Sequence, residues 1–299
     1  MALLLKSFNA GLITVKDPTD GDIQISYQIA GEGPPLLLLH GFPETKAIWH
    51  LVAPELTKHF TIVATDLRGY GASSKPPGQS NHSTYSKRSM AADQASVMKQ
   101  LGFDHYFVLG HDRGGRVGHR LAADFPDQVK KLMVLDISPT LAMYEQTTMQ
   151  FAGGYWHWFF LIQKEPIPER MIGADVDFFM TQFMGGRHAG LRIFDPACWQ
   201  EYLEAMKQPE CLHAMCEDYR ASFTIDLEHD RIDIAKGFKL PMPMKVMWGK
   251  HGQVNACFSP IKDWECVANH VFGNTVDCGH YIPEEMPNIV IKEAIDFFK

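Results

Sequence analysis

The chain has 299 residues, about twice the ~150 residues typical of one domain, so it holds either one large core or a core with an insertion. Its 45% apolar and 21% charged residues are ordinary for a globular protein and exclude a disordered or fibrous chain. Lys and Arg total 28 against 35 for Asp and Glu. The resulting net charge of −7 argues against a basic surface for nucleic acid.

The cysteines and the first residues bear on the compartment. Six cysteines at irregular spacings, with no C-x-x-C pair, do not predict a disulfide framework. Lys6 ends the apolar opening, and no run of about 18 apolar residues occurs, so we expect no secretory or membrane segment and a cytoplasmic protein. Cys211, His213 and Cys216 lie close together, but no second ligand pair follows at zinc spacing. We therefore expect neither a metal nor another cofactor.

Short apolar runs that end abruptly in Gly, Asp or His recur along the chain. Such runs, rich in Val, Ile and Leu, are typical of strands buried on both faces of a parallel sheet. A helical pattern over residues 86–101 separates two of them, with Gly102 at the expected end. The pattern predicts an α/β fold with a doubly wound sheet. The predicted strands are residues 35–39, 60–64, 106–109, 131–135 and 244–248.

The strand rhythm stops between about residues 140 and 235. This stretch is dense in aromatic residues and contains helix starts such as Asp195-Pro196, and Pro166 and Pro168 are expected to break a first long helix. We interpret residues 140–235 as a helical lid, or cap, inserted into a core formed by residues 1–139 and 236–299. Most of its aromatic residues are expected to form the lid's own core.

The turn at residues 110–115 contains the motif that most directly indicates a chemical function. Gly110-His111-Asp112-Arg113-Gly114-Gly115 follows a predicted strand and precedes a helix. The spacing Gly-x-nucleophile-x-Gly is that of a nucleophile elbow, in which flanking glycines allow a strained backbone to raise one side chain at the sheet edge. Here the central residue is Asp112. Alone, this Asp could equally be an ordinary helix cap, so the surrounding motifs decide.

Two further motifs have the positions that such an elbow requires. His40-Gly41-Phe42-Pro43 follows the first buried strand and predicts an oxyanion hole made by the backbone N–H groups of Phe42 and Arg113. His280 lies in a late Gly-His pair before the last helices, where the catalytic base of this architecture is found. The order of nucleophile, acid and base then leaves one carboxylate to be identified.

The orienting acid has two candidates. No carboxylate follows the strand at 244–248, whereas Asp136 ends the strand before the lid. A charge at the end of an apolar strand is costly unless paired, and the imidazole of His280 is the expected partner. Asp66 is the rival, although its surroundings are more typical of a structural turn.

An aspartate nucleophile with a histidine base predicts two steps. The carboxylate attacks an sp³ carbon, and activated water then cleaves the resulting ester, so the substrate is an alkyl halide or an epoxide. Arg113 and Arg116 lie three residues apart, on one helix face beside Asp112. They are expected to lower the pKa of Asp112 and to clamp a substrate carboxylate.

These residues resemble the haloacetate (fluoroacetate) dehalogenases of the α/β-hydrolase superfamily, over nearly the whole chain. The most specific matches are residues 40–43, 110–116, 155–158, 216–220 and 226–230. The resemblance implies Asp112 as nucleophile, Asp136 as acid, His280 as base, and Arg113 and Arg116 as the carboxylate clamp. It also implies that His157, Trp158 and Tyr219 hold the halide. The implied partners are a small haloacid and water, in a chain with no nucleic-acid or membrane partner, and homodimers are common in the family.

The resemblance has one gap. An aromatic residue expected from close relatives is missing around Gly185-Gly186-Arg187-His188, which leaves the pocket size and the halide preference open.

Two alternative functions also fit parts of the sequence. An epoxide hydrolase shares the His-Gly-x-Pro loop and the Asp elbow, but it usually has Trp after the nucleophile and paired lid tyrosines. Arg113 counts against it, whereas Tyr155 and Tyr219 leave the lid with tyrosines. A non-catalytic receptor on the same fold predicts a damaged triad, and Asp112, Asp136 and His280 are all present in order.

Overall fold

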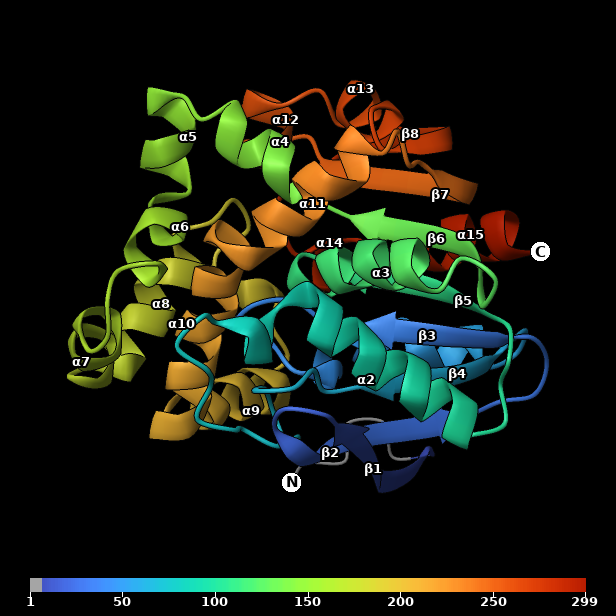
Figure 1. Cartoon of the computed structure of the whole chain (residues 1–299), viewed down its shortest axis with the longest axis horizontal. Coiled ribbons are helices and arrows are strands. Elements are labelled where there is room, and N and C mark those ends of the chain that lie inside the picture. Colours follow the sequence, from blue (N-terminus) through green and yellow to red (C-terminus); the bar gives the residue numbers. More distant parts are fainter. Residues whose placement is uncertain (1–6) are drawn as a thin grey trace.

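The computed structural model describes residues 7–299, which contain an eight-stranded, mostly parallel sheet (Figure 1). The strand order is β1-β2-β4-β3-β5-β6-β7-β8. The pairs β1–β2 and β2–β4 are antiparallel, and all other pairs are parallel. The strands are β1 Asn9–Asp17, β2 Gly21–Ala30, β3 Pro35–Leu39, β4 Thr61–Thr65, β5 Tyr106–His111, β6 Val129–Leu135, β7 Leu240–Gly249 and β8 Ala268–Val276.

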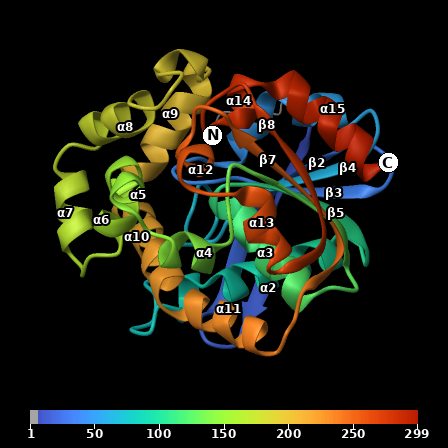
Figure 2. The same ribbon diagram turned by 90° about the horizontal axis from the view of Figure 1, so that it is seen from above.

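Helices cover both faces of this sheet. Figure 2 shows α2, α3 and α13 on one face, and α14 and α15 on the other. The helical segments outside the connection between β6 and β7 are η1 Lys46–Leu51, α1 Ala53–Leu56, η2 Ser83–Tyr85, α2 Lys87–Gln100, α3 Arg113–Asp124, α12 Gln253–Cys257, α13 Pro260–Glu265, α14 Ile282–Glu285 and α15 Pro287–Phe298. The α/β class predicted from the sequence is confirmed.

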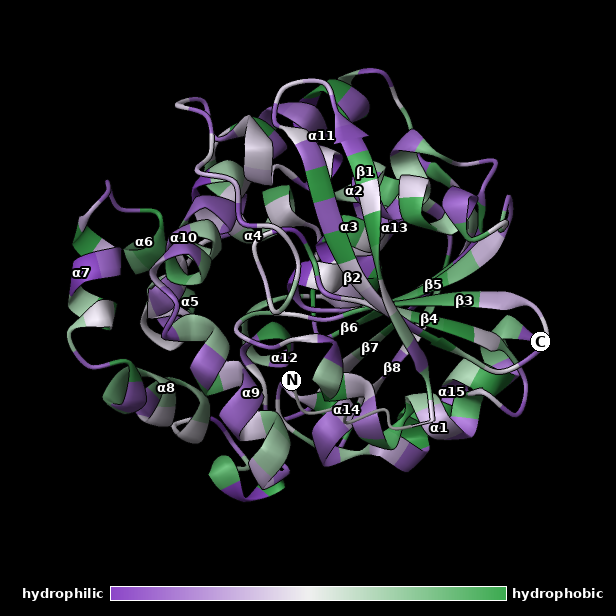
Figure 3. Cartoon of the chain, turned by 90° about the horizontal axis from the view of Figure 1, so that it is seen from below, coloured by the Kyte–Doolittle hydropathy of each residue, from purple (hydrophilic) through white to green (hydrophobic). Residues whose placement is uncertain are grey.

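The burial of β3 explains why its sequence is a continuous apolar run. Leu37 and Leu39 pack into the core on one face, and Leu36 and Leu38 pack into the core on the other. All four are fully buried. In Figure 3 the central strands are mostly green, whereas β1 and β2 alternate between purple and green. A strand covered on both faces needs apolar residues at every position.

The antiparallel hairpin β1–β2 is absent from the sequence prediction. β1 is half exposed, and its residues alternate in burial instead of forming an apolar run. An edge strand with one solvent-exposed face alternates between apolar and polar residues, so its sequence contains no apolar run. For this reason the strand is not predicted. β8 also lacks an apolar run, because most of its residues are exposed.

The register of the parallel strands determines where the candidate functional residues lie. Leu39 pairs with Gly110, His111 pairs with Leu135, and Leu135 pairs with Met247. These four strands therefore end at the same edge of the sheet. The residues that directly follow them are brought together there, as expected for ligand sites in open α/β sheets.

The chain between β6 and β7 is helical, and its helices between residues 149 and 223 lie beyond this edge, on the left in Figure 1. The division into core and lid domains stays a prediction. The expected long first helix is wrong, because three short helices precede Pro166. No helix within residues 7–299 is long and apolar enough to cross a membrane. The helices of this segment are α4 Thr140–Glu145, α5 Met149–Gly154, α6 Trp156–Leu161, α7 Ile167–Gly173, α8 Val176–Gly185, η3 Leu191–Ile193, α9 Pro196–Met206, α10 Pro209–Phe223 and α11 Ile225–Ala235.

Candidate active site

Asp112 occupies the sharp turn between β5 and α3. Its φ of 43° lies in the left-handed region, which a residue with a Cβ adopts only under strain. The flanking glycines allow the turn: a Cβ on Gly114 would lie 2.3 Å from the carbonyl oxygen of Leu39, and one on Gly110 would lie 2.6 Å from that of Gly114. Strain of this kind clusters at functional sites and holds one carboxylate at the sheet edge.

The Asp112 carboxylate is buried, with 5% of the residue exposed, and it accepts a hydrogen bond from the backbone N–H of Phe42 over 3.1 Å. Burial by itself raises the pKa of Asp112, but the positive charges of Arg116 and Arg113 oppose it, and the pKa lies below its usual value. The side chain is therefore an ionised, partly desolvated carboxylate. Such a group is a competent nucleophile.

His280 and Asp136 are joined at the same edge. His280 Nδ1 lies 2.5 Å from Asp136 Oδ2, and the backbone N–H of Gly249 donates to Asp136 Oδ1 over 2.9 Å. Burial raises the pKa of Asp136 to about 7, although the Gly249 hydrogen bond opposes this, and burial holds the pKa of His280 well below its usual value. His280 is therefore neutral and can accept a proton at neutral pH.

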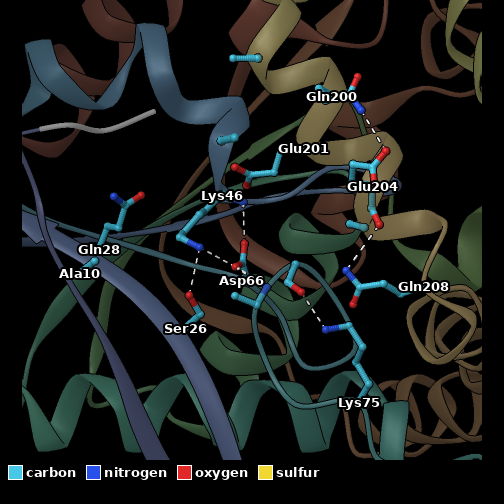
Figure 4. Close-up of a pocket in the computed structure, with 15 residues that line it drawn as sticks. Ala10, Ser26, Gln28, Lys46, Asp66, Lys75, Gln200, Glu201, Glu204 and Gln208 are labelled. Carbon is cyan, nitrogen blue, oxygen red and sulfur yellow. Dashed lines mark hydrogen bonds and ion pairs between the residues drawn. The ribbon is translucent and has the colours of Figure 1, made fainter. Parts of the chain in front are cut away.

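The rival acid, Asp66, lies elsewhere. Its Oδ2 forms an ion pair of 2.5 Å with Lys46 Nζ, and its Oδ1 accepts from the backbone N–H of Lys46. This pair lines a groove of about 660 Å³, in which Figure 4 shows Lys46 reaching Ser26 and Asp66. Neither Asp112 nor His280 lines that groove. Asp136, and not Asp66, is the carboxylate beside His280.

Arg113, the first residue of α3, forms a buried ion pair with Asp218. Its Nη2 lies 2.6 Å from Asp218 Oδ1 and its Nε lies 3.1 Å from Asp218 Oδ2, in a bidentate arrangement. The guanidinium also stacks on the ring of Tyr219, 4.1 Å from its centroid. Within residues 7–299, the buried Nη1 of Arg113 has no hydrogen-bond partner.

Arg116 lies one turn further along α3 and is held by neutral groups. Its Nη1 donates to the carbonyl oxygen of Ser138 over 3.1 Å and to Thr140 Oγ1 over 3.0 Å, and its guanidinium lies 4.6 Å from the ring centroid of Trp158. Its buried Nε makes no hydrogen bond to any described residue. Both arginines beside Asp112 thus keep one unsatisfied buried N–H donor.

The three residues expected to hold a halide lie together. His157, Trp158 and Tyr219 are buried, and the ring centroids of His157 and Tyr219 lie 5.9 Å apart. Phe42 packs against Tyr219 at 5.2 Å between centroids, which joins this group to the loop after β3. Burial and the charge of Arg187 hold the pKa of His157 well below its usual value, so its ring is neutral.

Two site residues were not predicted from the sequence. The hydroxyl of Tyr155 lies 3.3 Å from His280 Nδ1, and His111 Nε2 lies 2.9 Å from the carbonyl oxygen of His280. The other ring nitrogen of His111 contacts Glu44 Oε2 over 3.0 Å, deep in the core. Only contacts between residues more than 100 positions apart reveal these roles.

The candidate metal residues in α10 have ordinary partners. The Cys211 thiol donates to the carbonyl oxygen of Gly69, and His213 contacts Glu169 and the carbonyl oxygen of Pro77. These contacts tie α10 to neighbouring segments.

The chain is similar in sequence and in fold to known hydrolases. A family model, described as the alpha/beta hydrolase fold, matches residues 34–287. The fluoroacetate dehalogenase of Burkholderia sp is 44% identical over 90% of this chain and 88% of its own length. The soluble epoxide hydrolase of Corynebacterium sp. (strain C12) is 33% identical over 92% of this chain and 93% of its own. A solved structure from Nostoc sp PCC 7120, assigned to the alpha/beta hydrolases, has a TM-score of 0.93 and 44% identity, covering 98% of this chain and 99% of that one.

Proposed function

The chain belongs to the alpha/beta hydrolase family, and we propose that it is a haloacetate dehalogenase, which converts fluoroacetate and water into glycolate and halide. The hydrolase class follows from the family. The narrower activity is supported by the similarity to a fluoroacetate dehalogenase and by the chemistry of the groups around Asp112.

One observation carries the proposal. Arg113 Nη1 and Arg116 Nε are buried donors without a partner in the described part of the chain, and both arginines flank the ionised Asp112. An unsatisfied buried donor costs about 1–3 kcal/mol, so two of them beside a nucleophile indicate a ligand with acceptor atoms. A carboxylate supplies two oxygens in the geometry that guanidinium groups prefer. An epoxide oxygen or a simple alkyl halide supplies no such pair.

The proposed first step is a displacement at carbon. The two arginines hold the substrate carboxylate, and a carboxylate oxygen of Asp112 attacks the carbon that carries the halogen. A C–O ester bond forms while the carbon–halogen bond breaks, and the halide leaves with the electron pair. His157, Trp158 and Tyr219 stabilise the departing anion with N–H and O–H donors, which matter most for fluoride because it is a poor leaving group.

The second step regenerates the enzyme. His280 takes a proton from water, and the resulting hydroxide attacks the carbonyl carbon of the Asp112 ester. The backbone N–H groups of Phe42 and Arg113 are the proposed oxyanion hole for the tetrahedral intermediate. Collapse of this intermediate breaks the ester C–O bond, and the leaving alkoxide takes the proton from His280 to give glycolate. The Asp112 carboxyl group then loses its proton to water, which restores the carboxylate.

Epoxide hydrolysis is the second candidate, because of the similarity to the Corynebacterium enzyme. Epoxide opening needs a phenol aimed at the leaving oxygen. The Tyr155 hydroxyl instead lies beside His280 Nδ1, the nitrogen that faces Asp136. Of the pair Tyr155 and Tyr219, only Tyr219 then remains for that role, which favours the dehalogenase.

The test uses purified protein with fluoroacetate, chloroacetate and styrene oxide, and measures halide and diol release. We expect halide release from both haloacetates, none from an Asp112→Asn control, and little diol. For Arg116→Gln we expect kcat/KM for chloroacetate to fall by about tenfold to a hundredfold, the loss of one charge-assisted hydrogen bond. Arg88→Gln is the matched control, because that arginine is exposed and paired with Asp124. Diol release without any halide release would overturn the proposal in favour of an epoxide hydrolase.

A further inference from the structure

Arg187, just beyond α8, brings a third guanidinium to the active site. Its Cζ lies 5.0 Å from the ring centroid of Tyr155 and 5.6 Å from that of Tyr281, and both of these rings pack against the ring of His280. It also lies 4.8 Å from the ring centroid of Phe183, which itself packs on His157 at 4.7 Å between centroids. The cation therefore sits among the neighbours of both the base and the halide site.

No carboxylate among residues 7–299 lies within ion-pair distance of Arg187. Its Nε is shielded from solvent and has no hydrogen-bond partner among those residues. Arg113, by contrast, has Asp218 as a bidentate partner. The Arg187 guanidinium contacts aromatic rings and the Tyr155 hydroxyl, and its Nε keeps donor capacity for an anion.

A cavity of about 420 Å³ opens beside this guanidinium and reaches the catalytic base. Its volume corresponds to on the order of ten water molecules, whereas a haloacetate has no substituent on the carbon under attack. Five of the fourteen residues that line it are glycines, and at Gly279 a side chain would not fit, because a Cβ there would lie 2.9 Å from that of His188. The polar side chains that line it include Arg187, His157, His188, His251 and His280.

We propose that this cavity is a second anion-binding subsite, in which Arg187 binds a carboxylate carried by a substituent on the attacked carbon. The inference rests on the proposed dehalogenase function and extends its substrates to 2-halodicarboxylates. Arg113 and Arg116 hold the carboxylate next to the reacting carbon, and Arg187 holds the distal one.

The chemistry is the same two-step hydrolysis. An oxygen of Asp112 bonds to C2 of a 2-halosuccinate, and the halide leaves with the electron pair of the broken carbon–halogen bond. Water, deprotonated by His280, then cleaves the ester and gives malate, one halide ion and one proton. Attack from the side opposite the halogen inverts the configuration at C2.

The test compares three substrates: chloroacetate, 2-chloropropionate and 2-chlorosuccinate. 2-Chloropropionate has a branched carbon without a second charge, so it separates the effect of size from that of charge. We expect the wild-type protein to release chloride from 2-chlorosuccinate with inverted malate as product. In Arg187→Met the ratio of kcat/KM for 2-chlorosuccinate to that for 2-chloropropionate should fall at least about tenfold. Arg187→Lys should recover part of it.

Arg192→Met is the matched control, because Arg192 is an exposed arginine five positions further along, and it should leave the ratio unchanged. The ratio is measured within each variant, so a loss of folded protein does not affect it. Chloride release from chloroacetate but not from 2-chlorosuccinate, or an unchanged ratio in Arg187→Met, would overturn the inference alone. No chloride release from any of the three would remove the proposed function and this inference with it.

Discussion

The Nδ1 atom of His280 lies 2.5 Å from Asp136 Oδ2, which leaves Nε2 as the ring nitrogen that can take a proton from water. The Asp136 backbone is anchored as well, because its N–H donates to the carbonyl oxygen of Met247 over 2.7 Å. The proposed base is thus oriented through Asp136 by contacts with two neighbouring strands, β6 and β7.

His280→Asn should separate the two steps of the reaction. Ester formation needs only Asp112, whereas ester hydrolysis needs the base, so the variant should accumulate a carboxymethyl group on Asp112. Intact-mass measurement after incubation with fluoroacetate checks this. The double variant with Asp112→Asn should stay unmodified, and an unmodified single variant would contradict the assignment of His280 to the second step.

The pH dependence should differ between the steps. The pKa of Asp136 is raised to about 7 by burial, so below that pH the carboxylate takes up a proton and no longer stabilises a protonated His280. The pKa of Asp112 is lowered by the neighbouring positive charges, so the nucleophile stays ionised.

We expect steady-state halide release to fall by up to about tenfold per pH unit below about pH 7, while the first-turnover burst stays constant down to about pH 5. Rapid-quench measurement of halide separates the two phases. A burst that falls together with the steady-state rate would show that the titrating group acts on the first step instead.

The sequence was most informative where chemistry depends on local spacing. The glycines around Asp112 and the position of Asp136 after a buried strand are local patterns, and the parallel register brings both to one edge. The engagement of Arg113 with Asp218 could not be predicted, because those residues are 105 positions apart and meet only when α10 packs over the sheet edge. The same holds for Tyr155 and His111 beside His280.

Trp158→Phe should impair fluoroacetate turnover more than chloroacetate turnover. The substitution removes the indole N–H, and the smaller fluoride ion depends more on hydrogen bonds when it leaves. The measurement is kcat/KM for both substrates. Trp156→Phe is the control, since Trp156 is two positions away and 45% exposed, whereas Trp158 is 1% exposed. Equal losses on both substrates would indicate that Trp158 acts only through packing, for example under the Arg116 guanidinium.

Glu44→Gln should destabilise the fold. Glu44 and His111 form a fully buried pair, with Glu44 Oε2 3.0 Å from His111 Nδ1. Burial lowers the pKa of His111, but the Glu44 carboxylate outweighs this and raises the pKa to about 9, so the imidazole is charged at neutral pH. Removing the carboxylate leaves that cation without its partner.

Breaking a buried pair from one side typically costs about 3–5 kcal/mol. We expect a loss of that size in the free energy of unfolding, measured by urea titration at pH 7. Glu55→Gln is the matched control, because Glu55 forms an exposed ion pair with Lys58 and should change stability by less than about 1 kcal/mol. Similar stability losses in the two variants would show that the buried pair is held mainly by its other contacts.

His111 also contacts the carbonyl oxygen of His280. The folded fraction of Glu44→Gln should therefore hydrolyse the ester more slowly while keeping its first-turnover burst.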